Sequence, residues 1–126
     1  MTSNSSENLH PAARAAASAP LEADIPEPEQ VNGLEDVRQA IDTIDAQIIG
    51  LLSKRLDYVK AAADFKPDLQ AVPAPERVRE MLNDRSDWAS ALGLNPDFIA
   101  PWFAQISEWF IRQQIAHWPN RNHRPR

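Results

Sequence analysis

Several charged or amide side chains in this sequence lie where apolar residues are expected, and they are the groups that could bind a ligand or take part in a reaction. Positions 34, 37, 41, 44, 48, 51, 55, 58, 62 and 65 step by three and four, and all but one are Leu, Val, Ile, Tyr, Ala or Phe. The exception is Arg55. Burying a guanidinium without an anion costs several kcal/mol. Arg55 is therefore expected to face a carboxylate, either a protein acid such as Asp57 or a ligand.

Lys66 is a second cation that could take part in binding an anion. On an ideal helix Lys66 lies about 20° from Arg55 around the axis, so both share a face if the helix continues that far. Pro67 follows, and a cation at such a hinge can close over a bound anion. Gln114 is an amide among apolar neighbours, which either ties two helices together or donates to a ligand oxygen.

Arg38 and Arg77 are weaker candidates for the same anion site. Arg38 lies about 25 Å from Arg55 along a helix, so one chain cannot bring both to one pocket. In an antiparallel dimer Arg38 could reach the opposite site; otherwise it is a surface arginine near Asp42. Arg77 could join the cluster, although Glu80 is an obvious alternative partner.

The elements that must position these side chains are all helical, so the predicted fold class is all-α with three helices. The first helix runs from 34 to about 66 and ends before Pro67, because the residue before a proline is pushed out of helical geometry. A second helix begins at Pro75 and is capped by Gly93. A third begins with Asn95 as its N-cap.

The length of the first helix predicts a partner chain. A helix of this length spans about 50 Å, whereas a compact domain of about 90 residues is only about 30 Å across. Its apolar stripe would project beyond anything that the other two helices could cover, and such stripes are association surfaces. We expect an intertwined helical homodimer; the alternative is a helical hairpin whose long helix frays.

Composition divides the 126-residue chain into three parts. Residues 1–32 are rich in Ala, Ser, Pro and Glu and are expected to form a disordered tail. Residues 33–118 form the helical domain, and residues 119–126 form a basic tail.

Several function classes are excluded by composition. The chain has no cysteine, so disulfides, thiolate metal sites and cysteine nucleophiles are absent. The histidine spacing predicts no metal site, and the net charge of −5 disfavours nucleic acid as a partner. The sequence shows neither a membrane span nor a secretory signal, which favours the cytoplasm.

Three segments of the sequence resemble the all-helical chorismate mutase (type II) family, and within it the isochorismate-pyruvate lyase branch, which makes salicylate for siderophore pathways. The resemblance covers about residues 33–118, and the segments are LEDVRQAIDTIDAQIIGLLSKRLDYVKAAADFK, VPAPERVREML and FAQISEWFIRQQIAHW. It implies an intertwined homodimer with two identical sites, no cofactor, and a dianionic cyclohexadiene substrate, isochorismate or chorismate.

The resemblance also implies a role for each candidate residue. Arg38 would serve the neighbouring site, and Arg55 would hold a substrate carboxylate. Lys66 would close over the ether oxygen and a carboxylate, while Gln114 would contact the ether or the ring. Arg77 falls on an arginine of the family's second helix.

Two departures from the mutase pattern favour the lyase. Many mutases of this group carry an acid where this chain has Ala74, and a Glu where it has Val78. The expected reaction is a pericyclic elimination of pyruvate from isochorismate that gives salicylate. A weak chorismate mutase activity of the same pocket is expected beside it. The alternatives are a chorismate mutase and a non-catalytic helical dimerisation module.

Overall fold

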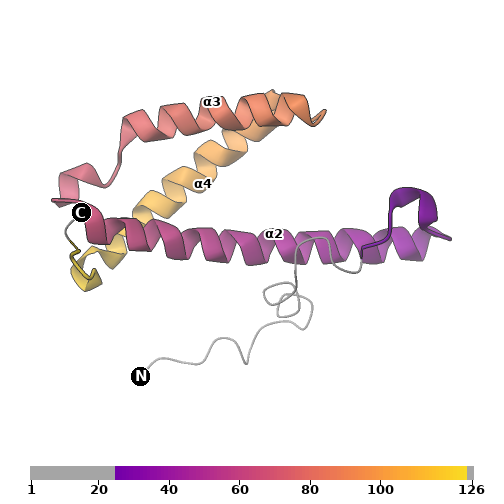
Figure 1. Ribbon diagram of the computed structural model, residues 1–126, viewed down its shortest axis with the longest axis horizontal. Coiled ribbons are helices and arrows are strands. Elements are labelled where there is room, and N and C mark those ends of the chain that lie inside the picture. The colour runs from indigo at the N-terminus through magenta and orange to yellow at the C-terminus, as the bar shows by residue number, and fades with distance from the viewer. Residues whose placement is uncertain (1–24, 125–126) are drawn as a thin grey trace, which may run out of the picture. The chain divides into compact units, whose positions relative to one another are not determined.

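The computed structural model describes residues 25–124, and every regular element in this range is helical (Figure 1). Three α-helices follow in order: α2 (Leu34–Ala62), α3 (Pro75–Ala91) and α4 (Pro96–His117). The predicted all-α fold with a long first helix is thereby confirmed. No helix in the described range is long and apolar enough to cross a membrane.

The chain divides into two compact units, residues 1–55 and 56–126, and α2 contributes to both. In the first unit a 3-10 turn, Pro28–Gln30, precedes α2. The Glu27 backbone N–H donates to the Gln30 side chain at 3.1 Å, which closes a capping box. Residues 25–32 fall in the segment expected to be a disordered tail, yet here they form a capped turn; residues 1–24 lie outside the described range.

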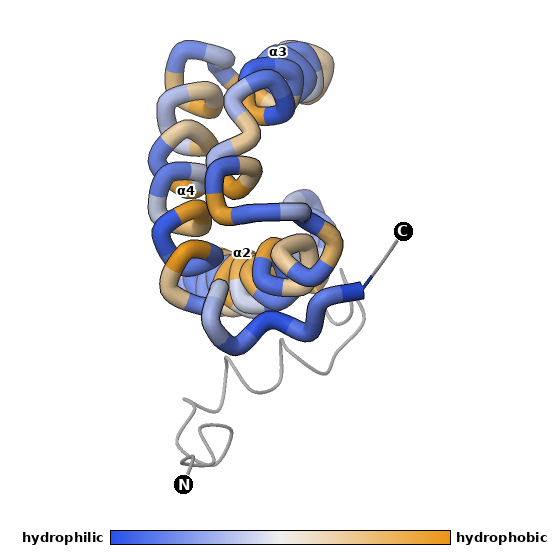
Figure 2. Tube along the Cα trace, turned by 90° about the vertical axis from the view of Figure 1, so that its left-hand side faces the viewer, coloured by the Kyte–Doolittle hydropathy of each residue, from blue (hydrophilic) through white to orange (hydrophobic). Residues whose placement is uncertain are grey.

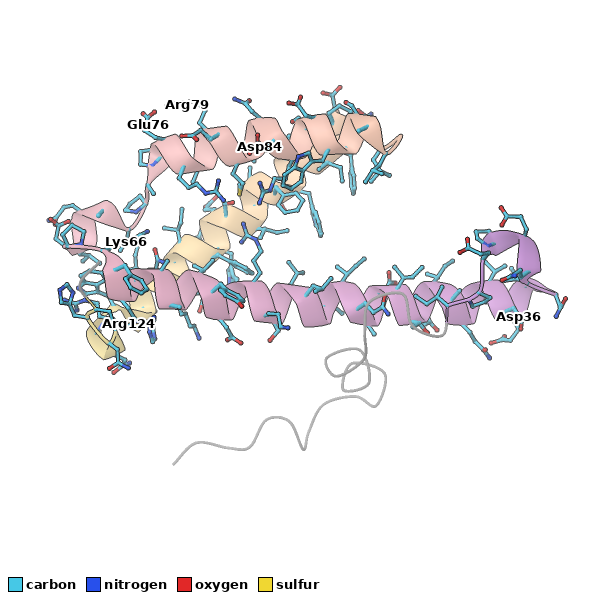
Figure 3. The ribbon with its side chains drawn as sticks, viewed as in Figure 1. Asp36, Lys66, Glu76, Arg79, Asp84 and Arg124 are labelled. Atoms are coloured by element: carbon cyan, nitrogen blue, oxygen red, sulfur yellow. The ribbon has the colours of Figure 1, made fainter. Side chains whose placement is uncertain are left out.

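The start of α2 is fixed by its own acidic residues. Asp36 accepts the backbone N–H of Asn32 at 3.0 Å, and Glu35 lies in the same first turn, where negative charge is favourable (Figure 3). Most of the apolar stripe of α2 is exposed in the structure. The exposed members are Leu34, Val37, Ile41, Ile44, Ile48, Leu51 and Tyr58. The described part of the chain thus leaves a long apolar surface open to solvent.

The end of α2 differs from the prediction by one turn. The α-helix stops at Ala62, and Ala63–Phe65 tighten into a 3-10 turn. Lys66 then has extended backbone angles, φ −89° and ψ 140°, because Pro67 disfavours the helical region for it. Lys66 is therefore not a helical residue, and the helical projection that put it on one face with Arg55 does not apply.

The second unit contains α3 and α4, which pack against each other. The predicted Asn95 cap is present: its side chain accepts the Asp97 backbone N–H at 2.9 Å. Gly93 ends the preceding helix with a φ of 78°, which favours glycine. Ser107 on α4 donates to the sulfur of Met81 on α3 at 3.5 Å, and both side chains are buried. Hydrophobic positions recur between hydrophilic ones along α4 (Figure 2).

Candidate functional site

Lys66 and Gln114 are 48 residues apart in the sequence and meet in the second unit. The Lys66 ammonium donates to the Gln114 side-chain oxygen at 2.9 Å and to the Val72 carbonyl at 2.8 Å. The Gln114 side-chain nitrogen donates in turn to the Val59 carbonyl. The structure therefore places two predicted site residues in one hydrogen-bonded chain that links the end of α2, the loop and α4.

Gln114 and two residues close to Lys66 in the sequence are removed from solvent. Gln114 is only 2% exposed, and both Ala63 and Val72 are fully buried nearby in the sequence. An ammonium has three N–H donors, and two of those on Lys66 are used by the carbonyl and the amide. The third has no acceptor among the residues the structure describes. Lys66 can thus offer one N–H and its charge to a bound anion.

Burial changes the electrostatics of Lys66. Desolvation disfavours the charged form, and this lowers the pKa of the Lys66 ammonium from its ordinary value. The group is half-buried and so keeps contact with solvent. A partly desolvated cation interacts more strongly with a negative charge than a fully hydrated one does. The arrangement suits stabilisation of an oxygen on which negative charge develops.

The loop before α3 presents the Val72 carbonyl to Lys66. A 3-10 turn, Leu69–Ala71, is capped by Asp68, whose side chain accepts the Ala71 backbone N–H at 3.1 Å. Ala74, the N-cap of α3, has a φ of 44°, a left-handed conformation that is uncommon for alanine. This loop is thus held by local hydrogen bonds and by the buried Val72 side chain.

Arg38 and Arg55 lie on α2 in the first unit. Arg38 is exposed, and among the described residues it makes no ion pair with Asp42. Arg55 is half-buried, and the Nη1 atom of its guanidinium is screened from solvent. That Arg55 faces a carboxylate, either of a protein acid such as Asp57 or of a ligand, stays a prediction.

Arg77 lies exposed in the first turns of α3, and its charge acts on a cation that the sequence reasoning missed. Burial first, and then the positive charge of Arg77, lower the pKa of Arg85, while Asp84 opposes them. The Arg85 guanidinium carbon lies 4.5 Å from the centre of the Trp88 ring. The sequence does contain a signal for this pair: Arg77 and Arg85 are eight residues apart, about two helical turns, and so lie on similar sides of α3. The ion pair of this turn is between Arg79 and Glu76, at 2.9 Å, and not between Arg77 and Glu80.

Asp64 is a second residue that the sequence reasoning did not single out. It is 8% exposed and pairs with Arg124 at 2.8 Å. Arg124 lies at the same end of α2 as Lys66 in Figure 3. Nothing in the local sequence pattern indicates this pair, because the two residues are far apart in the chain.

The described residues contain no cluster of three or more His, Cys, Asp or Glu side chains that could hold a metal ion. The candidate residues carry ammonium, guanidinium and amide groups.

Comparison with known proteins places this chain among related sequences. The family profile described as "Chorismate mutase type II" matches residues 37–115. A protein of Pseudomonas aeruginosa named "Isochorismate pyruvate lyase" is 50% identical over 91 residues, which cover 72% of this chain and 90% of that protein. The "T-protein" of Enterobacter agglomerans is 37% identical over 67 residues, which cover 52% of this chain but only 18% of that protein.

Proposed function

The chain belongs to the type II chorismate mutase family, and on this premise we propose that it is an isochorismate-pyruvate lyase. The family resemblance inferred from the sequence is confirmed. The observation that favours the lyase over other activities of the family is the extent of identity with the Pseudomonas protein of that name. The Lys66–Gln114 pair supplies the chemistry that such a reaction needs.

The proposed reaction converts isochorismate to salicylate and pyruvate in one pericyclic step. The ring C–O ether bond breaks, a ring hydrogen moves to the methylene carbon of the enolpyruvyl group, and that group leaves as pyruvate while the ring becomes aromatic. The step needs no nucleophile and no external proton donor. The protein must hold a flexible dianion in its reactive conformation and stabilise charge on the ether oxygen.

The roles of the individual residues follow this demand. In this proposal Lys66 binds the ether oxygen, where its third N–H and its positive charge stabilise the negative charge of the transition state. Gln114 holds the Lys66 ammonium through its oxygen and lies beside the ether or the ring. Arg55 binds a substrate carboxylate, Arg77 contributes further positive charge, and Arg38 serves the site of the neighbouring chain.

A homodimer is part of this proposal. Its support is the exposed apolar stripe of α2, since a stripe of this length is uncommon on a monomer. Light scattering at micromolar concentration is expected to give twice the mass of one chain, and a monomer would refute the dimer.

Sharing of Arg38 between chains has its own test. Arg38→Ala and Arg55→Ala homodimers are each expected to be inactive. A mixed dimer of the two variants would place both losses in one site and leave the other site intact. Mixing is therefore expected to restore about half of the wild-type activity per dimer. No recovery in verified mixed dimers would contradict the sharing.

Chorismate mutase is the second candidate, and it is favoured by the name of the matching family profile. Purified protein should be given isochorismate and chorismate separately, with salicylate fluorescence and chorismate absorbance as readouts. Salicylate formation is the expected result. Consumption of chorismate alone would instead identify a mutase, and inertness toward both would leave a non-catalytic dimerisation module.

A further inference from the structure

The last described residues of the chain fold back onto the turn that precedes Lys66. The Asp64 carboxylate accepts the backbone N–H of Asn122 at 2.9 Å and pairs with the Arg124 guanidinium at 2.8 Å. The Arg124 backbone N–H donates to the Asp64 carbonyl at 2.6 Å. The Arg124 guanidinium carbon also lies 4.4 Å from the centre of the Phe65 ring.

These contacts bear on Lys66 because the turn is short. Asp64 and Phe65 are the two residues before Lys66, and the turn closes through a 3.3 Å hydrogen bond from the Lys66 N–H to the Ala63 carbonyl. The turn is a 3-10 extension of the end of α2, and 3-10 hydrogen bonds have poorer geometry than those of an α-helix, so contacts from outside the turn can add to its stability. The returning chain supplies such contacts on the side chain and on the backbone of Asp64.

The burial of Asp64 argues that this is more than a surface ion pair. The Asp64 side chain is 11% exposed, whereas that of Arg124 is 52% exposed. A carboxylate that is nearly removed from water requires hydrogen-bond partners, and charge-assisted bonds are stronger than neutral ones. The partners come from residues 122 and 124, which follow the 3-10 turn Trp118–Asn120 at the end of α4. The helix that carries Gln114 is thus continued by a segment that holds the turn before Lys66.

We propose that Asp64 and Arg124 are positioning residues that keep the Lys66 ammonium on Gln114. Neither is placed against the substrate; both act through the turn. The role for catalysis rests on the proposed function, because it assumes that Lys66 acts on the substrate. The segment 119–126, expected from composition to be a basic tail, contains in residues 121–124 a structural part of the site.

The activity test compares two arginines. Arg124→Gln removes the charge and the stacking contact, and Arg112→Gln is the matched control, because Arg112 pairs with Glu108 on the exposed surface of α4. Since a displacement of about 1 Å can reduce catalysis by about 100-fold, Arg124→Gln is expected to lower kcat by about tenfold and to change KM little. Arg112→Gln is expected to leave both constants within about twofold of wild type.

Two further variants separate positioning from folding. Arg124→Lys keeps the charge and is expected to recover part of the lost kcat. Asp64→Asn keeps the side-chain volume and an acceptor for Asn122 but removes the ion pair, so its kcat should also fall. Circular dichroism at the assay temperature checks that each variant is folded. Equal kcat values for folded Arg124→Gln and Arg112→Gln would overturn the positioning role and leave the lyase proposal intact.

Hydrogen exchange gives a readout that does not depend on activity. Amide exchange in residues 63–66 is expected to be faster in Arg124→Gln than in wild type and unchanged in Arg112→Gln. The contacts of Asn122 and Arg124 with Asp64 and Phe65 are together called the clamp. Unchanged exchange in both variants would show that the clamp does not stabilise the turn. If the wild type turned over neither isochorismate nor chorismate, the proposed function would fail, and this measurement would still decide whether the clamp exists.

Discussion

Replacing Lys66 with methionine tests the central electrostatic claim. Methionine keeps an unbranched side chain of similar reach and removes the ammonium. The Val72 carbonyl and the Gln114 oxygen each lose a donor, at 2.8 Å and 2.9 Å. Because Lys66 is half-buried, water can reach these acceptors and replace part of what is lost. The change therefore removes a charge from the site without opening a cavity in the core.

The expected loss of activity is much larger than the expected loss of stability. Removing one preorganised donor at a developing oxyanion costs about 2.7–4 kcal/mol, or about 10²–10³ in kcat. Hydrogen bonds from a charged donor contribute about 1.5–3 kcal/mol, but release of the desolvation penalty offsets much of this. We expect the free energy of unfolding to fall by about 1 kcal/mol, which lowers Tm by about 4–8 °C.

The assay follows salicylate formation from isochorismate under saturating conditions, together with thermal unfolding of the same preparations. Lys54→Met is the matched control, because Lys54 is exposed on α2 and has no proposed role in the site. The control should match wild type in kcat. A kcat for Lys66→Met within about threefold of wild type would refute the reasoning, since that corresponds to less than about 1 kcal/mol of transition-state stabilisation.

Three other predictions concern Gln114, the titration of Lys66 and the N-cap of α4. Gln114→Leu keeps the buried volume but removes the hydrogen bonds to Lys66 and Val59. Urea unfolding should show a free energy of unfolding lower by about 1–2 kcal/mol, and kcat should fall as well. Unchanged stability would contradict the role of the amide. Activity should decline as the pH rises through the lowered pKa of Lys66, because the neutral amine carries no charge. The pH–activity profile of Lys66→Arg should lack this alkaline decline, because arginine stays charged. A decline that persists in Lys66→Arg would assign the titration to another group. Stability should change with pH in the opposite direction. The pKa of Lys66 is lower in the folded chain than in the unfolded chain, so between these two values the unfolded chain binds more protons. The contribution of Lys66 to the free energy of unfolding therefore rises with pH. Asn95→Ala should lower the stability of the second unit by about 1 kcal/mol in thermal unfolding, because the N-cap of α4 is lost. Asn95→Ser should keep most of the stability, because serine is also a good N-cap. Equal Tm values for the two variants would rule out the cap as the cause.

The helices and most of their limits were predictable from the sequence because they depend on local physics. Apolar spacing of three and four residues marks α2, and Asn95 with Pro96 marks the start of α4. One boundary differed from the prediction: before Pro67 the α-helix gives way to a 3-10 turn, about one turn earlier than expected. A proline in the sequence predicts that a helix ends before it. Whether the last turn is an α or a 3-10 turn depends on the residues that pack against it.

The candidate residues could be recognised in the sequence by their residue type, but their contacts could not. A cation on an apolar stripe and an amide among aromatic residues are visible in the sequence, because their environments conflict with their polarity. That Gln114 accepts from Lys66 and donates to Val59 required the packing of α4 against the end of α2. Such contacts join residues about 50 positions apart, and no local pattern carries information on them.

The sequence by itself determined that this chain is helical and where its helices begin, and it singled out Arg55, Lys66 and Gln114 as candidates for binding. Only the tertiary structure decided that Lys66 leaves the helix and is held by the Val72 carbonyl and by Gln114. It also decided that Arg124 returns to Asp64 beside that lysine. The physical reason is that helix formation is governed by neighbours in the chain, whereas the desolvation and pairing of a charge are governed by neighbours in space.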